Sequence, residues 1–198
     1  MSRLPQALDP LAYSDYLRKR SFAGFLYRKF WLYPRLARRL TGRVLDYGCG
    51  IGDFLRFRND TIGADINEYN VGYCIQKGLE ALVVESNHIP VEDGHFDGVM
   101  LDNVLEHIPA DSVDPVIAEI KRVLKPGGTI VAGVPGHKGY HSDPDHKVMY
   151  TENSLAALFA RHGFETKEVF LMPFACRKLE HIMRQFCIYA VFAPKNKN

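Results

Sequence analysis

Short apolar runs alternate with amphipathic stretches from residue 43 onward. Each run is rich in Val, Ile or Leu and is bounded by Gly, Pro or Asp, which is typical of buried strands. The runs predict strands at 43–47, 61–65, 81–85, 97–102 and 128–135. Apolar residues at helical spacing fill the intervals at 52–57, 68–77 and 112–124. This alternation predicts a parallel sheet with helices on both faces.

The pattern changes after Val134. The stretch "PGHKGYHSDPDHKVMY" predicts a polar loop, and "TENSLAALFARHGF" predicts a helix with Thr151 as its N-cap and Gly163 just past its end. Strands at 165–171 and 185–193 follow and suit an antiparallel hairpin. The chain is therefore predicted to form a Rossmann-like, doubly wound α/β sheet of seven strands, mostly parallel with an antiparallel last strand.

The segment before this pattern, 1–42, predicts a helical lead-in. In "SFAGFLYRKFWLY" apolar residues recur at helical spacing, while Arg28 and Lys29 point away from them. The predicted apolar face consists of Phe22, Leu26, Phe30 and Tyr33. We therefore divide the chain into a lead-in or lid at 1–42 and a single globular domain at 43–198.

Charge is distributed unevenly about this boundary. The segment 1–43 contains ten Lys or Arg and two Asp, a formal charge of +8, so the rest carries −6 within a total of +2. A basic segment of this kind is either a solvated helix face or a surface that attracts an anionic partner. Two functions stay open: a lid packed over a ligand, or a peripheral membrane contact through residues 18–40, whose aromatic side chains would rest on an anionic bilayer.

Length and cysteine usage limit the class of protein. A chain of 198 residues with 46% hydrophobic residues is long enough for one domain with a real core. The four cysteines, at 49, 74, 176 and 187, have neither CxxC nor Cys/His ligand spacing, so we interpret them as reduced thiols. The opening "MSRLPQALDP" lacks the apolar core of a secretory signal, and no segment is apolar for about 18 residues. A cytoplasmic location is predicted.

The glycines of "VLDYGCGIGDF" (44–54) indicate a ligand that approaches the backbone closely at a helix N-terminus. The dinucleotide fingerprint G-x-G-x-x-G fits poorly, because Asp53 stands where its third Gly belongs and a carboxylate repels a pyrophosphate. Asp65, at the end of the second predicted strand, is placed to accept hydrogen bonds from both hydroxyls of a ribose. The combination predicts a ligand with a ribose and no pyrophosphate.

Four stretches carry a resemblance to a known family: "VLDYGCGIGDF", "GADI", "HIPVEDGHFDGVMLDNVLEHI" and "LKPGGTIVAGVP". In order and spacing they resemble the motifs of the class I S-adenosylmethionine-dependent methyltransferases, particularly those that act on small molecules. The match runs from about residue 43 to residue 164. The resemblance implies an enzyme with S-adenosylmethionine as its cofactor.

The resemblance also implies roles for residues that follow the first two strands. Gly48, Gly50 and Gly52 would pass beneath the methionine and ribose parts of the cofactor. Asp46 would reach the amino group of the methionine part, and Asp65 would hold the ribose hydroxyls.

Further cofactor contacts are implied after the second, third and fourth strands. Ile66 would pack on the adenine. The adenine edge would be met by Glu85, Ser86 and Asn87. The methionine part and the methyl group would be bordered by Asp102 and Asn103.

Catalysis depends on the acceptor. Methyl transfer from a sulfonium mainly requires alignment, and a base is needed only where the acceptor must lose a proton, as a hydroxyl does. An imidazole suits this role because its pKa lies near neutrality. His146 is the first candidate and His107 the second, since both follow the carboxyl ends of predicted strands; a surface or hydrogen-bonding role is the alternative for each.

A metal site is the other interpretation of "HSDPDH" (141–146), whose His141, Asp143, Asp145 and His146 are all possible ligands. Their spacing matches no known site. Family members with a magnesium-bound catechol carry an Asp-Asn pair after the fifth strand, where this chain has "GVP" at 133–135. No metal is therefore predicted.

The segment "DNVLEH" (102–107) limits the acceptor. Enzymes that methylate amino groups of nucleic-acid bases usually carry Asn/Asp-Pro-Pro-Tyr/Phe at this place, so no nucleic-acid partner is expected. The prediction is methyl transfer to an oxygen or nitrogen of a small organic acceptor. Two alternatives remain: a cofactor-binding module without turnover, and a nicotinamide-dependent oxidoreductase.

Overall fold

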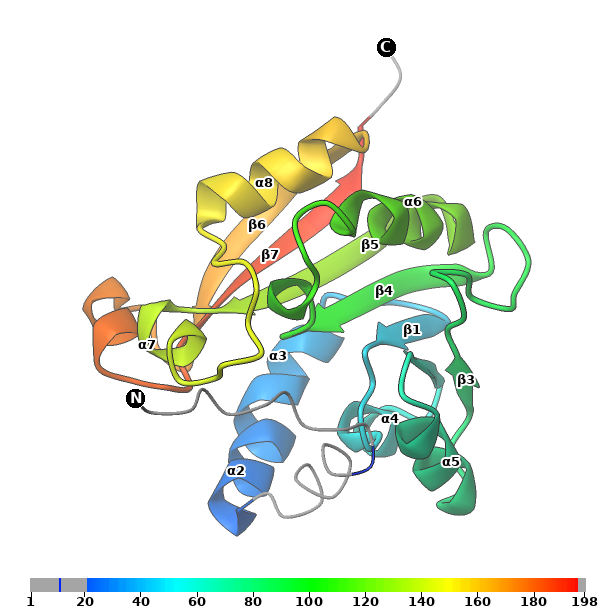
Figure 1. Ribbon diagram of the computed structural model, residues 1–198, viewed down its shortest axis with the longest axis horizontal. Helices are drawn as coiled ribbons and strands as arrows, with labels where there is room; N and C mark the ends of the chain where they lie inside the picture. The colour runs from blue at the N-terminus through cyan, green and yellow to red at the C-terminus, as the bar shows by residue number, and fades with distance from the viewer. Residues whose placement is uncertain (1–10, 12–20, 196–198) are drawn as a thin grey trace, which may run out of the picture.

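The computed structural model describes Leu11 and residues 21–195, which include a sheet in the order β3-β2-β1-β4-β5-β7-β6 (Figure 1). The strands are β1 (Val44–Tyr47), β2 (Thr61–Asp65), β3 (Ala81–Val83), β4 (Phe96–Asp102), β5 (Leu124–Pro135), β6 (Phe164–Met172) and β7 (Cys187–Pro194). β1 to β5 pair in parallel, whereas β7 is antiparallel to both β5 and β6. The predicted α/β sheet, with its antiparallel last strand, is confirmed. The start of the predicted lead-in, including residues 18–20 of the proposed membrane contact, lies outside the described residues.

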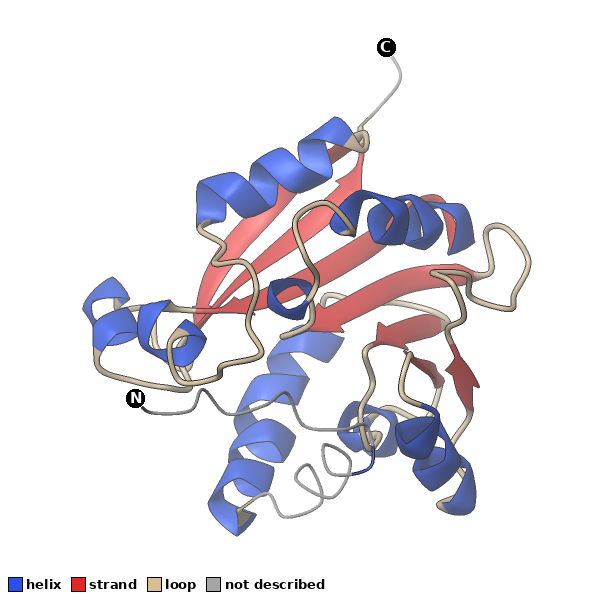
Figure 2. Cartoon of the chain, in the orientation of Figure 1, coloured by secondary structure: helices blue, strands red, loops and turns tan. Residues whose placement is uncertain are grey.

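Helices fill most connections between strands, as Figure 2 shows in blue. The α-helices are α2 (Phe22–Tyr27), α3 (Tyr33–Ala37), α4 (Asp53–Phe57), α5 (Glu68–Gln76), α6 (Val113–Val123), α7 (His137–Tyr140) and α8 (Glu152–Arg161). A π-helix, η1 (Arg28–Leu32), joins α2 to α3, and the 3₁₀ turns are η2 (Leu105–His107) and η3 (Arg177–His181). None of the helices in the described part of the chain is long and apolar enough to cross a bilayer.

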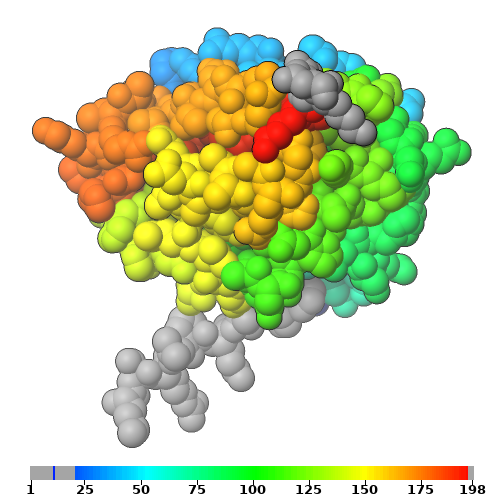
Figure 3. Space-filling view, turned by 90° about the horizontal axis from the view of Figure 1, so that it is seen from above, coloured from blue at the N-terminus to red at the C-terminus, as the bar shows by residue number. Residues whose placement is uncertain are grey.

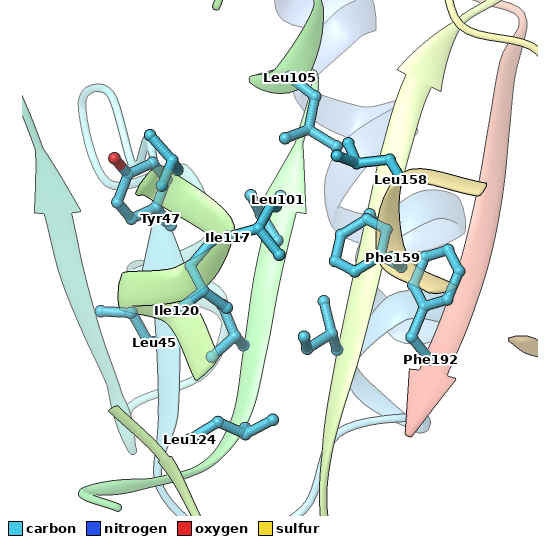
Figure 4. Packing of buried hydrophobic residues seen from close by; sticks show 14 of the residues in the cluster. Leu45, Tyr47, Leu101, Leu105, Ile117, Ile120, Leu124, Leu158, Phe159 and Phe192 are labelled. Carbon is cyan, nitrogen blue, oxygen red and sulfur yellow. The ribbon is translucent and has the colours of Figure 1, made fainter. Parts of the chain in front are cut away.

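The two faces of the sheet bury different sets of side chains, because successive strand residues point to opposite sides. Leu45 and Leu101 lie on the face covered by α6 and α8, and Figure 4 shows their packing against side chains of these helices. Val44 and Met100 lie on the opposite face, where they pack with residues of α3 and α4. The lead-in helix α3 is thus part of the core and closes one face of the sheet.

The edge formed by β6 is partly covered by α8. The space-filling view shows these segments, in orange and yellow, at the surface of the molecule (Figure 3). α8 begins where predicted: the Thr151 hydroxyl accepts from the Ser154 N–H, and the Ser154 hydroxyl accepts from the Thr151 N–H, which forms a capping box. Gly163 follows the helix with a left-handed φ of 88°.

Two predictions around β5 are wrong. The strand predicted at 128–135 begins at Leu124, because that residue already pairs with Phe96 of β4. The polar loop predicted after Val134 contains α7. The Gly136 N–H donates to the Phe186 carbonyl at 2.8 Å, so α7 is held by a contact with a distant segment of the chain that local sequence patterns do not reveal.

The predicted apolar face of the lead-in is also wrong. Phe22 and Phe30 are 73% and 65% exposed, whereas Tyr33, predicted to share their face, is buried. A π-helix closes its hydrogen bonds from i to i+5, so η1 shifts the phase of the residues on either side of it. Arg28, which was expected to point outward, instead forms a 3.2 Å ion pair with Asp53.

Candidate functional site

The carboxyl ends of β1, β2 and β4 bring the predicted cofactor residues to one edge of the sheet. The glycine loop, residues 48–52, connects β1 to α4. Gly48, Gly50 and Gly52 have φ values of 78°, 52° and 76°, a left-handed conformation that favours glycine. A Cβ at Gly48 would lie 2.4 Å from Cγ2 of Val104, so the turn packs tightly against the segment after β4.

Asp65 ties the glycine loop to the end of β2. Its Oδ2 accepts from the Gly50 N–H at 2.8 Å, and its Oδ1 accepts from the Asn67 N–H at 2.8 Å. Asn70 donates from Nδ2 to Oδ2 at 3.2 Å. Burial raises the pKa of Asp65, and these three hydrogen bonds oppose that rise by stabilising the carboxylate. The residue predicted to hold a ribose is therefore held in a fixed orientation.

The acidic residues near the glycine loop include Asp46, Asp65 and Asp102, each at the carboxyl end of a strand. Burial raises the pKa of Asp46 well above its usual value, and the charges of Asp102 and Asp65 raise it further. Such a group of carboxylates favours a ligand that brings positive charge and hydrogen-bond donors, and it disfavours a pyrophosphate.

Non-glycine residues with left-handed φ also gather at this edge. Among the described residues they are Ser86, Asn87 and Asn103, with φ values of 50°, 63° and 57°. All three belong to the predicted cofactor set. Because this conformation costs side-chain-bearing residues free energy, its concentration here is typical of a functional site. Beside them Ile66 is 76% exposed, an apolar surface next to Asp65 on which a flat ring could stack.

The two catalytic candidates lie side by side. The rings of His107, in η2, and His146, in the loop after α7, have centroids 4.7 Å apart at 65°. Nδ1 of His146 lies 2.8 Å from the Tyr140 carbonyl oxygen, and the ring of His146 stacks on the ring of Tyr140. Burial lowers the pKa of His107, as does the nearby His146, which favours a neutral imidazole. His141 lies elsewhere, with its ring 4.6 Å from that of His137.

Glu106 joins this pair, although it was not among the predicted site residues; packing of the turn after the fourth strand and a substrate-facing role were equal alternatives for it. It is 0% exposed, and its Oε1 lies 3.9 Å from Nε2 of His146. Burial raises the pKa of Glu106 to about 8. A Glu-His dipeptide directly after the fourth predicted strand was the available signal, but its pairing with a histidine from a distant loop is visible only in the fold.

Tyr189 of β7 was missed as well. Its hydroxyl donates to Oδ1 of Asp102 at 2.6 Å, and burial together with the Asp102 charge raises the pKa of that hydroxyl well above its usual value. The tyrosine therefore stays a hydrogen-bond donor. Its position near the end of the chain gave no signal of a contact with the fourth strand.

Comparisons with known proteins match part of the chain to one family and most of it to one fold. A family described as a methyltransferase domain matches residues 45–132. A structure of a SAM-dependent methyltransferase from Archaeoglobus fulgidus has the same fold, with a TM-score of 0.65 and 20% identity over 88% of this chain and all of that one. Residues 45–132 therefore match a methyltransferase domain, and the chain has the fold of S-adenosylmethionine-dependent methyltransferases. Both findings agree with the predicted resemblance to class I S-adenosylmethionine-dependent methyltransferases.

The chain matches only part of the length of its curated relatives. An uncharacterized protein of Methanocaldococcus jannaschii is 34% identical over 47% of this chain and 44% of its own length. Sterol 24-C-methyltransferase of Schizosaccharomyces pombe is 32% identical over 59% of this chain and 34% of its own length. The match spans less than half of either relative.

S-adenosylmethionine, the cofactor of enzymes with this fold, suits the residues gathered at this site. It carries a sulfonium, an ammonium group and two ribose hydroxyls, which are the positive charges and donors that Asp46, Asp65 and Asp102 favour. Ile66 adds an exposed apolar side chain beside Asp65. The chemistry of the donor set therefore matches the cofactor that the family uses.

Proposed function

We propose that this chain transfers a methyl group from S-adenosylmethionine to an oxygen or nitrogen of a small organic acceptor. The observation that carries the proposal is the placement of two neighbouring imidazoles beyond the end of β4, the strand that also ends in Asp102. The cofactor supplies an activated methyl group, and the protein aligns the acceptor with it and excludes water.

The proposed cofactor site contains the residues at the ends of the first four strands. They are Asp46, Gly48, Gly50, Gly52, Asp65, Ile66, Glu85, Ser86, Asn87, Asp102 and Asn103. Their support is the left-handed backbone in the glycine loop and after β3 and β4, together with the acidic character of the group. In this arrangement the carboxylates orient the cofactor and the loop after β3 meets its adenine.

His146 and His107 are the proposed proton acceptors. A free, neutral imidazole next to the acceptor takes the proton of a hydroxyl as the bond to the methyl group forms. The Tyr140 carbonyl fixes the ring of His146, so that Nε2 is the basic atom. An acceptor with a neutral amine needs no base before attack.

A screen for turnover tests the proposal. The chain is incubated with S-adenosylmethionine labelled in its methyl group and with phenols, hydroxy acids and amines, and the labelled products are separated. We expect label on oxygen or nitrogen of one class. Label on carbon of the acceptor, the chemistry named for the sterol relative, would contradict the proposed atom, and S-adenosylhomocysteine binding without turnover would favour the module that binds cofactor only.

For the lead-in we propose one of two roles: a lid over the ligand or a membrane contact. α3 packs on the domain and Arg28 reaches the glycine loop through Asp53, which favours the lid. The aromatic surface of α2 and η1 favours the membrane contact; its exposed residues are Phe22, Phe25, Phe30 and Trp31. Sedimentation with anionic vesicles at low salt separates the two, because a lid leaves the protein in the supernatant.

A further inference from the structure

Glu106, His107 and His146 form a cluster outside the glycine loop, here called the Glu106 cluster. η2 supplies Glu106 and His107, and the loop between α7 and α8 supplies His146. One ligand atom from each side chain lies within 4.8 Å of the other two. In the described part of the chain, no other group of at least three His, Cys, Asp or Glu residues comes this close.

The backbone fixes the cluster. The carbonyl of Glu106 accepts hydrogen bonds from the N–H groups of Lys147 and Val148 at 2.6 and 3.1 Å. These two residues directly follow His146, so the loop is pinned against η2 at the point where the imidazole meets the carboxyl group. The arrangement is built by the fold and does not depend on the side chains alone.

The Glu106 carboxyl group has an unusual environment. Its side chain is 1% exposed, and within the described residues neither oxygen has a hydrogen-bond partner. A buried carboxyl group without a partner carries a large desolvation cost, which a bound cation offsets. The nearest candidate partner, Nε2 of His146, is 3.9 Å away, which is too far for a hydrogen bond.

The imidazole of His146 is oriented as a metal ligand is. Nδ1 of His146 lies 2.8 Å from the Tyr140 carbonyl and donates its hydrogen there, which leaves a lone pair on Nε2, facing Glu106. Histidines that bind metals donate their other N–H to a carbonyl or carboxylate in this way. Nε2 of His146 and Oε1 of Glu106 thus lie 3.9 Å apart with no hydrogen bond between them.

We propose that Glu106, His107 and His146 bind one divalent transition-metal cation of the zinc class. Two nitrogens and one carboxylate oxygen are a common ligand set for zinc. Ligands about 2.0–2.1 Å from a tetrahedral ion lie about 3.3 Å apart. Side-chain rotations would have to close separations of 3.9 Å between Glu106 and His146 and of up to 4.8 Å within the cluster. Three protein ligands leave a fourth position for water or an acceptor oxygen, as in catalytic zinc sites.

The ion changes the role of the two imidazoles. A histidine that binds a metal through its lone pair cannot also accept a proton there, so an occupied cluster replaces the base role proposed above. Binding of the ion itself does not rest on methyl transfer. It is measured without S-adenosylmethionine, so failure of methyl transfer and failure of metal binding are distinguishable.

The test is a calorimetric titration of Zn²⁺ into the chelator-treated full chain. We expect one tight site per chain, weakened more than about 100-fold in Glu106→Gln and in His146→Ala. Glutamine has the shape of glutamate, and circular dichroism checks that each variant is folded. Co²⁺ bound at the same site should give the strong visible absorption of a tetrahedral ion.

A control variant separates the cluster from other histidines. The rings of His141 and His181 lie 4.6 Å and 4.7 Å from the ring of His137, and these three side chains are the obvious source of adventitious binding. The double variant His137→Ala/His141→Ala should keep the tight site. Loss of the site in this control, equal affinity in Glu106→Gln and wild type, or no tight site in wild type would each overturn the proposal.

Discussion

The glycine loop and the Glu106 cluster both lie beyond the carboxyl ends of strands, but they are held in different ways. The glycine loop takes its shape from left-handed backbone and from a hydrogen bond between Gly50 and the nearby Asp65. The cluster takes its shape from docking of the distant loop between α7 and α8, through two backbone bonds to Glu106. The first region is set locally, and the second exists only once the domain has folded around it.

This difference predicts which substitutions each of the two regions tolerates. Left-handed backbone at fixed positions is sensitive to side chains added there. A docked loop is instead sensitive to the contacts that hold it down. Substitutions should therefore damage one region while sparing the other.

The largest effect is expected from Gly52→Ala. Alanine would have to adopt a left-handed φ of 76°, and its Cβ would lie 2.7 Å from Cδ1 of Leu79 and 2.9 Å from Sγ of Cys74, so the free energy of unfolding should fall by about 2–4 kcal/mol. Binding of S-adenosylhomocysteine should be lost, whereas the folded fraction should still bind Zn²⁺, because neither contact belongs to the segments that supply the Glu106 cluster. Thermal unfolding and calorimetry measure both.

Gly72→Ala is the matched control for that change. Gly72 lies within α5, and a Cβ there would meet no atom within 4 Å. Alanine should therefore stabilise the protein by about 0.5–1 kcal/mol. Equal effects of the two substitutions would show that the glycine loop is not set by its backbone.

An intermediate effect is expected from Glu119→Gln, which tests whether the loop after β3, the proposed adenine contact, is held by local interactions alone. Glu119 of α6 accepts from the Ile89 N–H at 2.7 Å and from Arg122, so a distant helix holds the loop after β3. The substitution should lower the free energy of unfolding at pH 7 by about 1–2 kcal/mol. Denaturant unfolding at several pH values measures this.

The pH dependence of that effect has a fixed sign. The hydrogen bonds from Arg122 lower the pKa of Glu119 in the folded protein. Its contribution is therefore fully present above the unfolded pKa of about 4.3 and is lost as the pH falls through the lower folded value. The gap between wild type and variant should close at acid pH, and a gap independent of pH would reject the account.

The smallest effect is expected from Tyr140→Ala, which loosens the Glu106 cluster. The Tyr140 ring stacks on His146, with centroids 5.5 Å apart, while its carbonyl remains available after substitution. Loss of an aromatic pair worth about 0.5–1.5 kcal/mol should weaken Zn²⁺ binding by about 2- to 10-fold. S-adenosylhomocysteine should bind the variant as it binds wild type, and a parallel loss of both ligands would break the contrast between the regions.

The same difference explains what could be read from the sequence. The strands containing Leu45 and Leu101 and the N-cap at Thr151 were predictable, because alternation and capping are local patterns. The set of lead-in residues that face the core was not predictable, because the π-helix at Arg28–Leu32 has no local sequence signature.

In the candidate site, too, residues held by local contacts were predictable and residues held by distant contacts were not. Asp65 could be found from its place after a glycine-rich turn. Glu106 and Tyr189 could not, because their partners, His146 and Asp102, come from distant segments. The prediction that no metal binds was made without Glu106, because its pairing with His146 is visible only in the fold. The Zn²⁺ titration tests that prediction.

The central claim is that the glycine loop and Asp65 bind S-adenosylmethionine, and calorimetry with S-adenosylhomocysteine on wild type and Asp65→Asn tests it most directly. Asparagine keeps the shape of the side chain but removes the charge that faces the ribose hydroxyls. We predict binding to wild type below millimolar concentration and a loss of about 1–3 kcal/mol in the variant. No binding to wild type, or equal binding to both proteins, would contradict the account.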